Sequence, residues 1–248
     1  MVSIRCGDRL FDDVRAVLFD KDGTLANTGN FLVGLGRRRA RLIDARIPGV
    51  QEPLLMAMGI LDDGIDPAGL MAVGSRWETS VAAAAYVSET GRGWREALAI
   101  VHTSFAEADA TWSDKAAHTP LFGDAVPCLR RLCEAGLRLG IASADTTDNV
   151  EQFVEHYALA TYFDLMLGSD RQRAKPEKEF LLWACDALAV APQQMLIVGD
   201  SQADVDLARQ AETAGCVLID RGSGDPKARA DAHAVASVLT ALQLQISP

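Results

Sequence analysis

Five short apolar runs recur along the chain, at residues 16–19, 137–142, 163–167, 195–198 and 216–219. Each run is followed by loop or turn residues, and in most cases a helical pattern of apolar residues comes next. Strands that alternate with helices in this way pair in parallel, and a parallel sheet needs helices on both of its faces. The order of these runs therefore predicts an α/β fold with a parallel sheet covered by helices on both sides.

Helix signals between the runs agree with this prediction. Asp124 is placed to cap a helix that carries Pro127 in its first turn and stops at Gly136. Pro176 suits the first turn of a later helix. The buried face of that later helix is expected to contain Phe180, Leu181, Ala184 and Leu188.

A long interval, residues 29–116, separates the first run from the second and shows no convincing strand alternation. An amphipathic segment at 31–47, a capping-box spacing at Ser75 and Glu78, and a segment at 94–112 indicate three helices. We therefore expect a core domain of residues 1–28 and 117–248, interrupted by an all-helical insertion at 29–116. Residues 4–11 are a candidate for a short extra strand or a hairpin before the core.

Composition excludes several classes of protein. The formal net charge of -10 disfavours nonspecific binding to nucleic acid or to an anionic membrane. No stretch approaches 18 uninterrupted apolar residues, and the N-terminal residues lack the pattern of a secretory signal. The five cysteines form no Cys-x-x-Cys pair and suit reduced thiols. We expect a cytoplasmic protein, monomeric or homodimeric, with no nucleic-acid or membrane partner.

The first candidate site follows the run 16–19 directly and reads Asp20, Lys21, Asp22, Gly23, Thr24. Ligands of open parallel sheets bind outside the carboxyl ends of the strands, so both carboxylates emerge where a substrate would lie. Alternation places Asp20 and Asp22 on one side, and two close carboxylates invite a hard divalent cation. The alternative interpretation is a capped turn, for which these residue types are ordinary.

A second candidate site follows the run 195–198, where Gly199 and Asp200 precede a helix that contains Asp204. Asp200 is expected at the same edge of the sheet as Asp20, and Asp204 lies one helical turn further on. Capping of the helix by Asp200 or Ser201, with Asp204 favouring the positive end of the helix dipole, is the alternative interpretation of this motif.

Two further residues occupy comparable positions. Ser143 ends the run 137–142, where its hydroxyl and the following amides could hold phosphate oxygens. Lys175 stands at a helix entrance, which is unfavourable for a cation unless a local anion is present. A turn residue and a solvated lysine are the respective alternatives.

The order of these four signals resembles the haloacid dehalogenase superfamily, and within it the branch that includes phosphoglycolate phosphatase. Residues 20–24 match the first motif of that family, Ser143 the second, Lys175 the third, and Gly199, Asp200 and Asp204 the fourth. The resemblance implies a Rossmann-like core with a helical cap at 29–116. It also implies a phosphatase that acts on a small phosphorylated metabolite, such as phosphoglycolate or a sugar phosphate, and that requires Mg²⁺.

The resemblance further assigns a role to each matched residue. Asp20 is expected to attack phosphorus and form an aspartyl-phosphate, while Asp22 acts as acid and then base. Ser143, the amide of Ala144, and Lys175 would bind the phosphoryl oxygens, Lys175 also being a catalytic residue. The metal site is expected to comprise Asp20, Asp200, the main-chain carbonyl of Asp22, and Asp204, which would orient water bound to the ion.

Other reactions of the superfamily fit this chain less well. Carbon–halogen hydrolases of the superfamily lack an aspartate at the position of Asp22, and a phosphonate hydrolase of this branch needs a cap lysine, whereas residues 29–111 contain none. A phosphomutase of the same fold and a catalytically inactive regulatory protein stay open as alternatives. Ala144 departs from the asparagine that relatives often carry, so contacts to phosphate are expected to differ there.

Overall fold

The computed structural model describes residues 2–112, 114–169, 175, 177–222 and 224–246. The chain divides into two compact units, Met1–Asn27 with Thr119–Pro248, and Thr28–His118. The corresponding boundaries expected from the sequence lie after residues 28 and 116. Each unit has its own core, and each is described here by itself.

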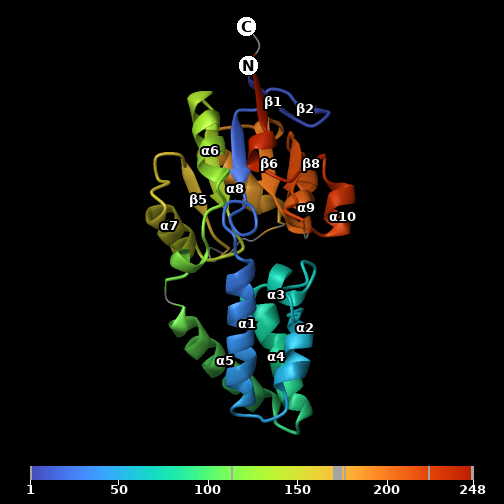
Figure 1. Cartoon of the computed structure of the whole chain (residues 1–248). Coiled ribbons are helices and arrows are strands. Elements are labelled where there is room, and N and C mark those ends of the chain that lie inside the picture. Colours follow the sequence, from blue (N-terminus) through green and yellow to red (C-terminus); the bar gives the residue numbers. More distant parts are fainter. Residues whose placement is uncertain (1, 113, 170–174, 176, 223, 247–248) are drawn as a thin grey trace. The chain divides into compact units, whose positions relative to one another are not determined.

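The first unit is built on a six-stranded sheet in which every neighbouring pair is parallel (Figure 1). The strands, in spatial order, are β5 (Leu165–Leu167), β4 (Arg138–Ala142), β3 (Ala16–Phe19), β6 (Met195–Gly199), β7 (Gly215–Ile219) and β8 (Ala234–Ala236). The predicted parallel sheet is therefore confirmed. Strand β8 was not predicted, because three residues at a sheet edge carry too little periodicity to be recognised.

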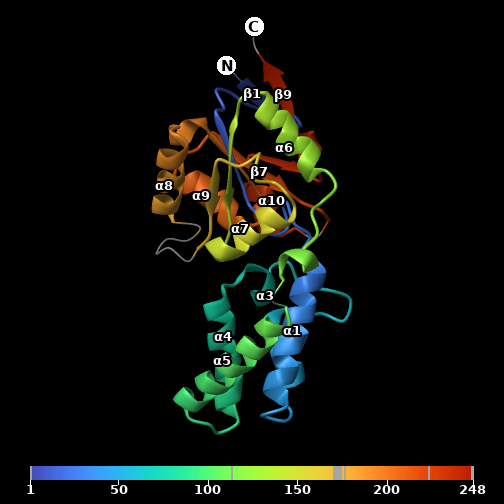
Figure 2. The ribbon, with the colours of Figure 1, turned by 90° about the vertical axis from the view of Figure 1, so that its left-hand side faces the viewer.

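Helices cover both faces of this sheet, and Figure 2 shows α8 and α9 on one side with α6 on the other. They are α6 (Ala125–Glu134), α7 (Thr147–His156), α8 (Lys178–Leu188), α9 (Gln202–Gln210) and α10 (Pro226–Asp231). One continuous core joins α8, α9 and α10 to alternate strand residues such as Ala16, Leu18, Met195 and Ile197. The predicted buried face of α8 is confirmed, whereas Pro176 lies outside the described residues.

A second, antiparallel sheet joins the two ends of the chain. Strand β1 (Val2–Cys6) pairs with β2 (Arg9–Phe11) as the expected hairpin, and its other edge pairs with β9 (Gln243–Ile246). Local sequence could indicate the hairpin, because its strands are neighbours along the chain. The pairing with β9 joins positions about as far apart as the chain allows, and no local pattern indicated it.

In the second unit, leaving out residue 113, the described elements are helices: α1 (Gly29–Asp44), α2 (Gln51–Met58), α3 (Leu70–Val73), α4 (Arg76–Glu89) and α5 (Trp94–Thr111). Their apolar faces share one core, which includes Leu54, Ala84 and Phe105. The predicted capping box is present, since the amide of Glu78 donates to the Ser75 hydroxyl and the Ser75 amide donates to the Glu78 carboxylate. The described residues of the two units also include three short 3₁₀ helices: Ala116–His118, Pro192–Gln194 and Leu239–Ala241.

The cap predicted for α6 is corrected by the structure. Asp124 occupies the position before the helix, but its side chain makes no capping hydrogen bond. Its carboxylate instead accepts from the Arg221 guanidinium at 3.0 Å and from the Leu239 amide at 2.6 Å. A charge-assisted bond to a guanidinium is stronger than a neutral bond to a helix amide, so the Asp124 carboxylate bonds to Arg221 and Leu239 instead of capping α6.

Two further expectations concerned the state of the cysteines and the presence of membrane-spanning segments. All five cysteines are free thiols, and four of them are buried. Among the described helices, none is both long enough and apolar enough to cross a membrane.

Candidate active site

The candidate site lies at the carboxyl end of β3, where the direction of chain progression across the sheet reverses. From β3 the chain proceeds to β4 and β5 on one side, then returns to β6 on the other. Such a switch point leaves an open crevice beyond the strand ends, which is where ligands bind in open α/β sheets. Asp20 stands directly in this position, and its amide still donates to Val198 O of β6 at 2.8 Å.

The chain turns tightly after Asp20. The amides of Leu25 and Ala26 both donate to the carbonyl of Lys21, and the amide of Gly23 donates to Ala26 O. Gly23 adopts a φ of 82°, in the left-handed region that residues without a Cβ enter at little cost. This turn keeps the side chains of Asp20 and Asp22 at the strand end.

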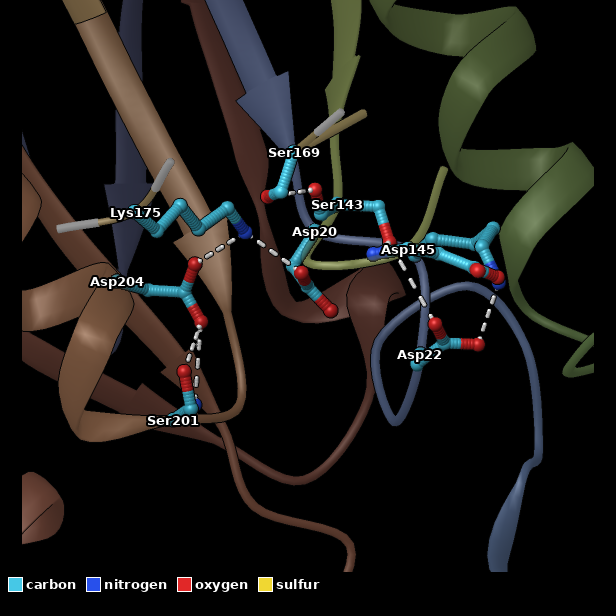
Figure 3. Close-up of polar contacts among 9 residues, drawn as sticks. Asp20, Asp22, Ser143, Asp145, Ser169, Lys175, Ser201 and Asp204 are labelled. Carbon is cyan, nitrogen blue, oxygen red and sulfur yellow. Dashed lines mark hydrogen bonds and ion pairs between the residues drawn. The ribbon is translucent and has the colours of Figure 1, made fainter. Parts of the chain in front are cut away.

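Lys175 joins the first and fourth motifs of the site (Figure 3). Its ammonium lies 2.6 Å from Asp20 Oδ1 and 2.7 Å from Asp204 Oδ1, and the lysine side chain is only 5% exposed. Two carboxylates therefore compensate one buried cation. The predicted cluster of Asp20, Lys175 and Asp204 is brought together by the fold.

Asp204 is held on its other oxygen by Ser201. The hydroxyl of Ser201 donates to Asp204 Oδ2 at 2.6 Å, and its amide donates to the same oxygen at 3.2 Å, as in a capping box at the start of α9. With Lys175 on Oδ1, both carboxylate oxygens of Asp204 are thus occupied. Ser201, one of the two residues that the sequence offered as a cap for this helix, occupies the position directly before it.

Asp200 approaches the same loop from β6. A Cβ added to Gly23 would lie 1.8 Å from Asp200 Oδ2, so the Asp200 carboxylate occupies the space that any other residue at position 23 would fill. The absence of a side chain at Gly23 is therefore what allows Asp200 to lie beside the turn that carries Asp20 and Asp22.

The concentration of carboxylates perturbs the proton affinities of the site. Burial, together with repulsion from Asp204 and Asp22, raises the pKa of Asp20 to about 7, even though Lys175 acts in the opposite direction. Burial and the charges of Asp20 and Asp204 raise the pKa of Asp200 well above its ordinary value. Burial also disfavours the charge of Lys175, but Asp20 and Asp204 outweigh this and raise the pKa of Lys175.

Asp22 and Ser143 meet from adjacent strands. The Ser143 hydroxyl, at the end of β4, donates to Asp22 Oδ2 at 3.4 Å (Figure 3). Ser143 is buried, and Ala144 beside it is exposed. The structure thus places the predicted acid–base residue beside the predicted phosphate-binding residue.

Two charged residues of this region have no role in the sequence-based assignment. Lys21 is 1% exposed, and its ammonium contacts Asp22 Oδ1 at 2.5 Å and Asp145 Oδ2 at 3.2 Å. Burial opposes the charge of Lys21, but the two carboxylates outweigh it and raise its pKa. The available signal was the charge itself: a lysine between two aspartates at a buried strand end requires counter-charges.

Comparison with known proteins identifies the family. A family model of haloacid dehalogenase-like hydrolases matches residues 14–212, which include every residue of the site described above. The chain belongs to this family.

The hydrolase is 29% identical over 214 residues to the phosphoglycolate phosphatase of Shigella boydii, covering 83% of this chain and 80% of that protein. The phosphoglycolate phosphatase of Escherichia coli K12 matches with the same identity and coverage. A solved structure of a predicted phosphoglycolate phosphatase from Haemophilus somnus superposes with a TM-score of 0.68 at 18% identity, over 92% of this chain and 95% of that one. This superposition confirms the Rossmann-like fold of the hydrolase.

The acidic residues of this hydrolase suit a hard divalent cation, although within the described ranges no three acidic, histidine or cysteine side chains already form a metal cage. The site brings the carboxylates of Asp20, Asp22, Asp200 and Asp204 together with the ammonium groups of Lys175 and Lys21. Burial, and then repulsion among these carboxylates, raises the pKa values of Asp20 and Asp200. Oxygen ligands with uncompensated charge are those that Mg²⁺ prefers. The space left open at Gly23 admits one of these ligands, so the donor set fits the ion.

Proposed function

We propose that this hydrolase is a Mg²⁺-dependent phosphatase that acts on a small phosphorylated metabolite through an aspartyl-phosphate on Asp20. The observation that carries the proposal is the contact of the buried Lys175 ammonium with the Asp20 carboxylate at the switch point of the sheet. A carboxylate that is held by a cation at a ligand-binding edge is suited to attack an anionic group, since the cation offsets the repulsion between them.

The reaction is proposed to proceed in two displacements. An oxygen of the Asp20 carboxylate attacks phosphorus, the bond to the ester oxygen breaks, and Asp22 gives a proton to that leaving oxygen. Asp22 then takes a proton from water as the water oxygen attacks phosphorus, which releases inorganic phosphate and restores Asp20. Splitting one difficult displacement into two easier ones is the benefit of a covalent intermediate.

Three groups are proposed to hold the phosphoryl oxygens during these steps. Lys175 already lies beside Asp20, and the hydroxyl of Ser143 and the amide of Ala144, an exposed residue, come from the next strand end. Fixed donors of this kind stabilise the charge that develops on the equatorial oxygens and need no reorganisation during the reaction.

Mg²⁺ is proposed to be held by the carboxylates of Asp20 and Asp200 and the main-chain carbonyl of Asp22, with Asp204 adjoining. A bound divalent cation supplies positive charge that allows an anionic ester to approach this acidic site. Asp204 already bonds to Lys175 and Ser201, so its proposed contribution is to fix the arrangement around the ion.

Phosphoglycolate and sugar phosphates are the proposed substrates. The names of the relatives from Shigella boydii and Escherichia coli, which match over more than four fifths of the chain, support phosphoglycolate. The helical insertion, residues 29–116, is proposed as the cap domain of the enzyme, with discrimination between leaving groups as its role.

The test is phosphate release from a panel of small phosphate esters, measured with Mg²⁺, with EDTA, and with the Asp20→Asn variant. We expect turnover that requires Mg²⁺ and that Asp20→Asn abolishes. Asp148→Asn, an exposed aspartate in the first turn of α7, is the matched control and should keep full activity. Turnover that survives Asp20→Asn, or no release from any ester, would overturn the proposal.

A further inference from the structure

The Lys21 side chain forms a buried ionic contact that the proposed reaction does not use. Its ammonium contacts Asp22 and Asp145 and lies 5.5 Å from the centroid of the Phe153 ring. A lysine is rarely buried so completely unless its charge is paired. The position therefore needs an explanation in terms of its two carboxylate partners.

These contacts close a ring of four residues, Lys21, Asp22, Ser143 and Asp145, of which the last three are labelled in Figure 3. Lys21 contacts Asp22 Oδ1 and also Asp145, the amide of Asp145 donates to the Ser143 hydroxyl at 3.1 Å, and that hydroxyl donates to Asp22 Oδ2. Each carboxylate oxygen of Asp22 thus has its own donor. A carboxylate bonded at both oxygens to fixed groups has one preferred orientation.

Asp145 is anchored independently of Lys21. Its Oδ1 accepts from the Thr146 amide at 2.9 Å and from the Asn149 side chain at 2.7 Å, at the start of α7. Oδ2 is the oxygen that faces Lys21. The first turn of α7 therefore fixes the position of Asp145. Lys21, which contacts both carboxylates, in turn fixes the Asp22 carboxylate relative to Asp145.

We propose that Lys21 and Asp145 are positioning residues, which together hold the Asp22 carboxylate in the orientation required for proton transfer. This inference rests on the proposed function, because it assigns Asp22 the acid–base role. Neither residue contacts the phosphoryl group in this scheme; both act through Asp22.

The phosphate-binding serine is held by other contacts. The Ser143 amide donates to Leu167 O at 2.9 Å, and its carbonyl accepts from the Ser169 hydroxyl at 2.9 Å. Loss of the Lys21 ammonium therefore frees Asp22 and leaves the main chain of Ser143 in place. An effect on kcat with little effect on phosphate affinity is the signature of this arrangement.

The experiment compares Lys21→Met, Asp145→Asn and the double variant with the wild type, with Mg²⁺ present. The measurements are kcat, KM and inhibition by inorganic phosphate. We expect each single variant to lower kcat about 10- to 100-fold, the range that misplacement of a catalytic group produces, and to change KM and phosphate inhibition less than about 3-fold. Because the ring is interrupted at either position, the double variant should be no slower than the slower single variant.

Two controls separate positioning from loss of stability. Leu188→Ala removes a buried side chain at the end of α8, before the chain enters the amino-terminal end of β6, whereas the site lies at the carboxyl ends of the strands. It should lower stability without lowering kcat. Lys21→Arg keeps the positive charge and should retain more activity than Lys21→Met. If Lys21→Met does not fold, Asp145→Asn and Lys21→Arg still test the inference.

Three results would overturn the inference: unchanged kcat in the single variants, a loss of phosphate affinity as large as the loss of kcat, or multiplied losses in the double variant. An inactive wild type, or activity in Asp20→Asn, would instead overturn the proposed function. The two failures are therefore distinguishable in the same set of measurements.

Discussion

The Lys175 ammonium lies 2.6 Å from a carboxylate oxygen of Asp20, although 155 positions separate the two residues along the chain. The same ammonium lies 2.7 Å from Asp204, and all three side chains are almost fully buried. The enzyme thus keeps the carboxylate of Asp20, the proposed nucleophile, beside a buried positive charge. The consequences of this contact can be measured.

Lys175→Met is expected to reduce kcat about 100- to 1,000-fold, as loss of one preorganised charged donor does. Without the ammonium, the pKa of Asp20 should rise above about 7, so that the remaining activity shifts to more alkaline pH. A pH–rate profile checks both points. Lys178→Met, which removes an exposed lysine three residues further on, is the control, and an unshifted profile in Lys175→Met would contradict the assignment.

Gly23→Ala is expected to lose Mg²⁺-dependent turnover, because its Cβ would lie 1.8 Å from Asp200 Oδ2. The left-handed φ of 82° adds about 1–2 kcal/mol of strain. Gly136→Ala is the matched control, since its φ is 79° and nothing lies within 4 Å of its Cβ. Urea unfolding and Mg²⁺ titration of activity compare the variants; the same behaviour in both would show that the clash with Asp200 is unimportant.

Stability should depend on pH and on Mg²⁺ together. The folded-state pKa values of Asp20 and Asp200 are raised, so the folded protein binds more protons than the unfolded chain from about pH 4 to about pH 7, and the free energy of unfolding falls as pH rises through this window. Mg²⁺ binds the deprotonated carboxylates, so it should raise Tm more at about pH 8 than at about pH 5.5.

Thermal unfolding with and without Mg²⁺ measures this effect, and a metal concentration of about 100 times Kd should add about 2.7 kcal/mol of stability. Asp200→Asn should lose the shift, whereas Asp206→Asn, on α9 outside the site, should keep it. An equal Tm shift at both pH values would contradict the role of these carboxylates as ligands.

Asp124 should stabilise the fold by its ion pair with Arg221, and not by capping α6. A double-mutant cycle with Asp124→Ala and Arg221→Ala should give a coupling free energy of about 1–3 kcal/mol, because the carboxylate and the guanidinium bond directly at 3.0 Å. Equilibrium unfolding of the four proteins provides the value. A coupling near zero would instead favour the helix-capping role that the sequence suggested.

Local sequence patterns were sufficient to predict several elements of both units. The strands at residues 16–19 and 195–198 could be recognised because a fully buried parallel strand is apolar at every position. The capping box of Ser75 and Glu78 could be recognised because its two partners are three residues apart. Strand β8 escaped recognition because three residues carry too little periodicity, and β9 because its partner β1 lies at the other end of the chain.

The amino-acid sequence by itself determined where the aspartates of the site emerge, since a strand end, a glycine turn and a helix start are local features. The tertiary structure alone decided which distant side chains meet: Lys175 with Asp20 and Asp204, and Lys21 with Asp145. The physical reason is that a buried charge must find a counter-charge in three dimensions, and the nearest carboxylate in space is seldom the nearest one along the chain.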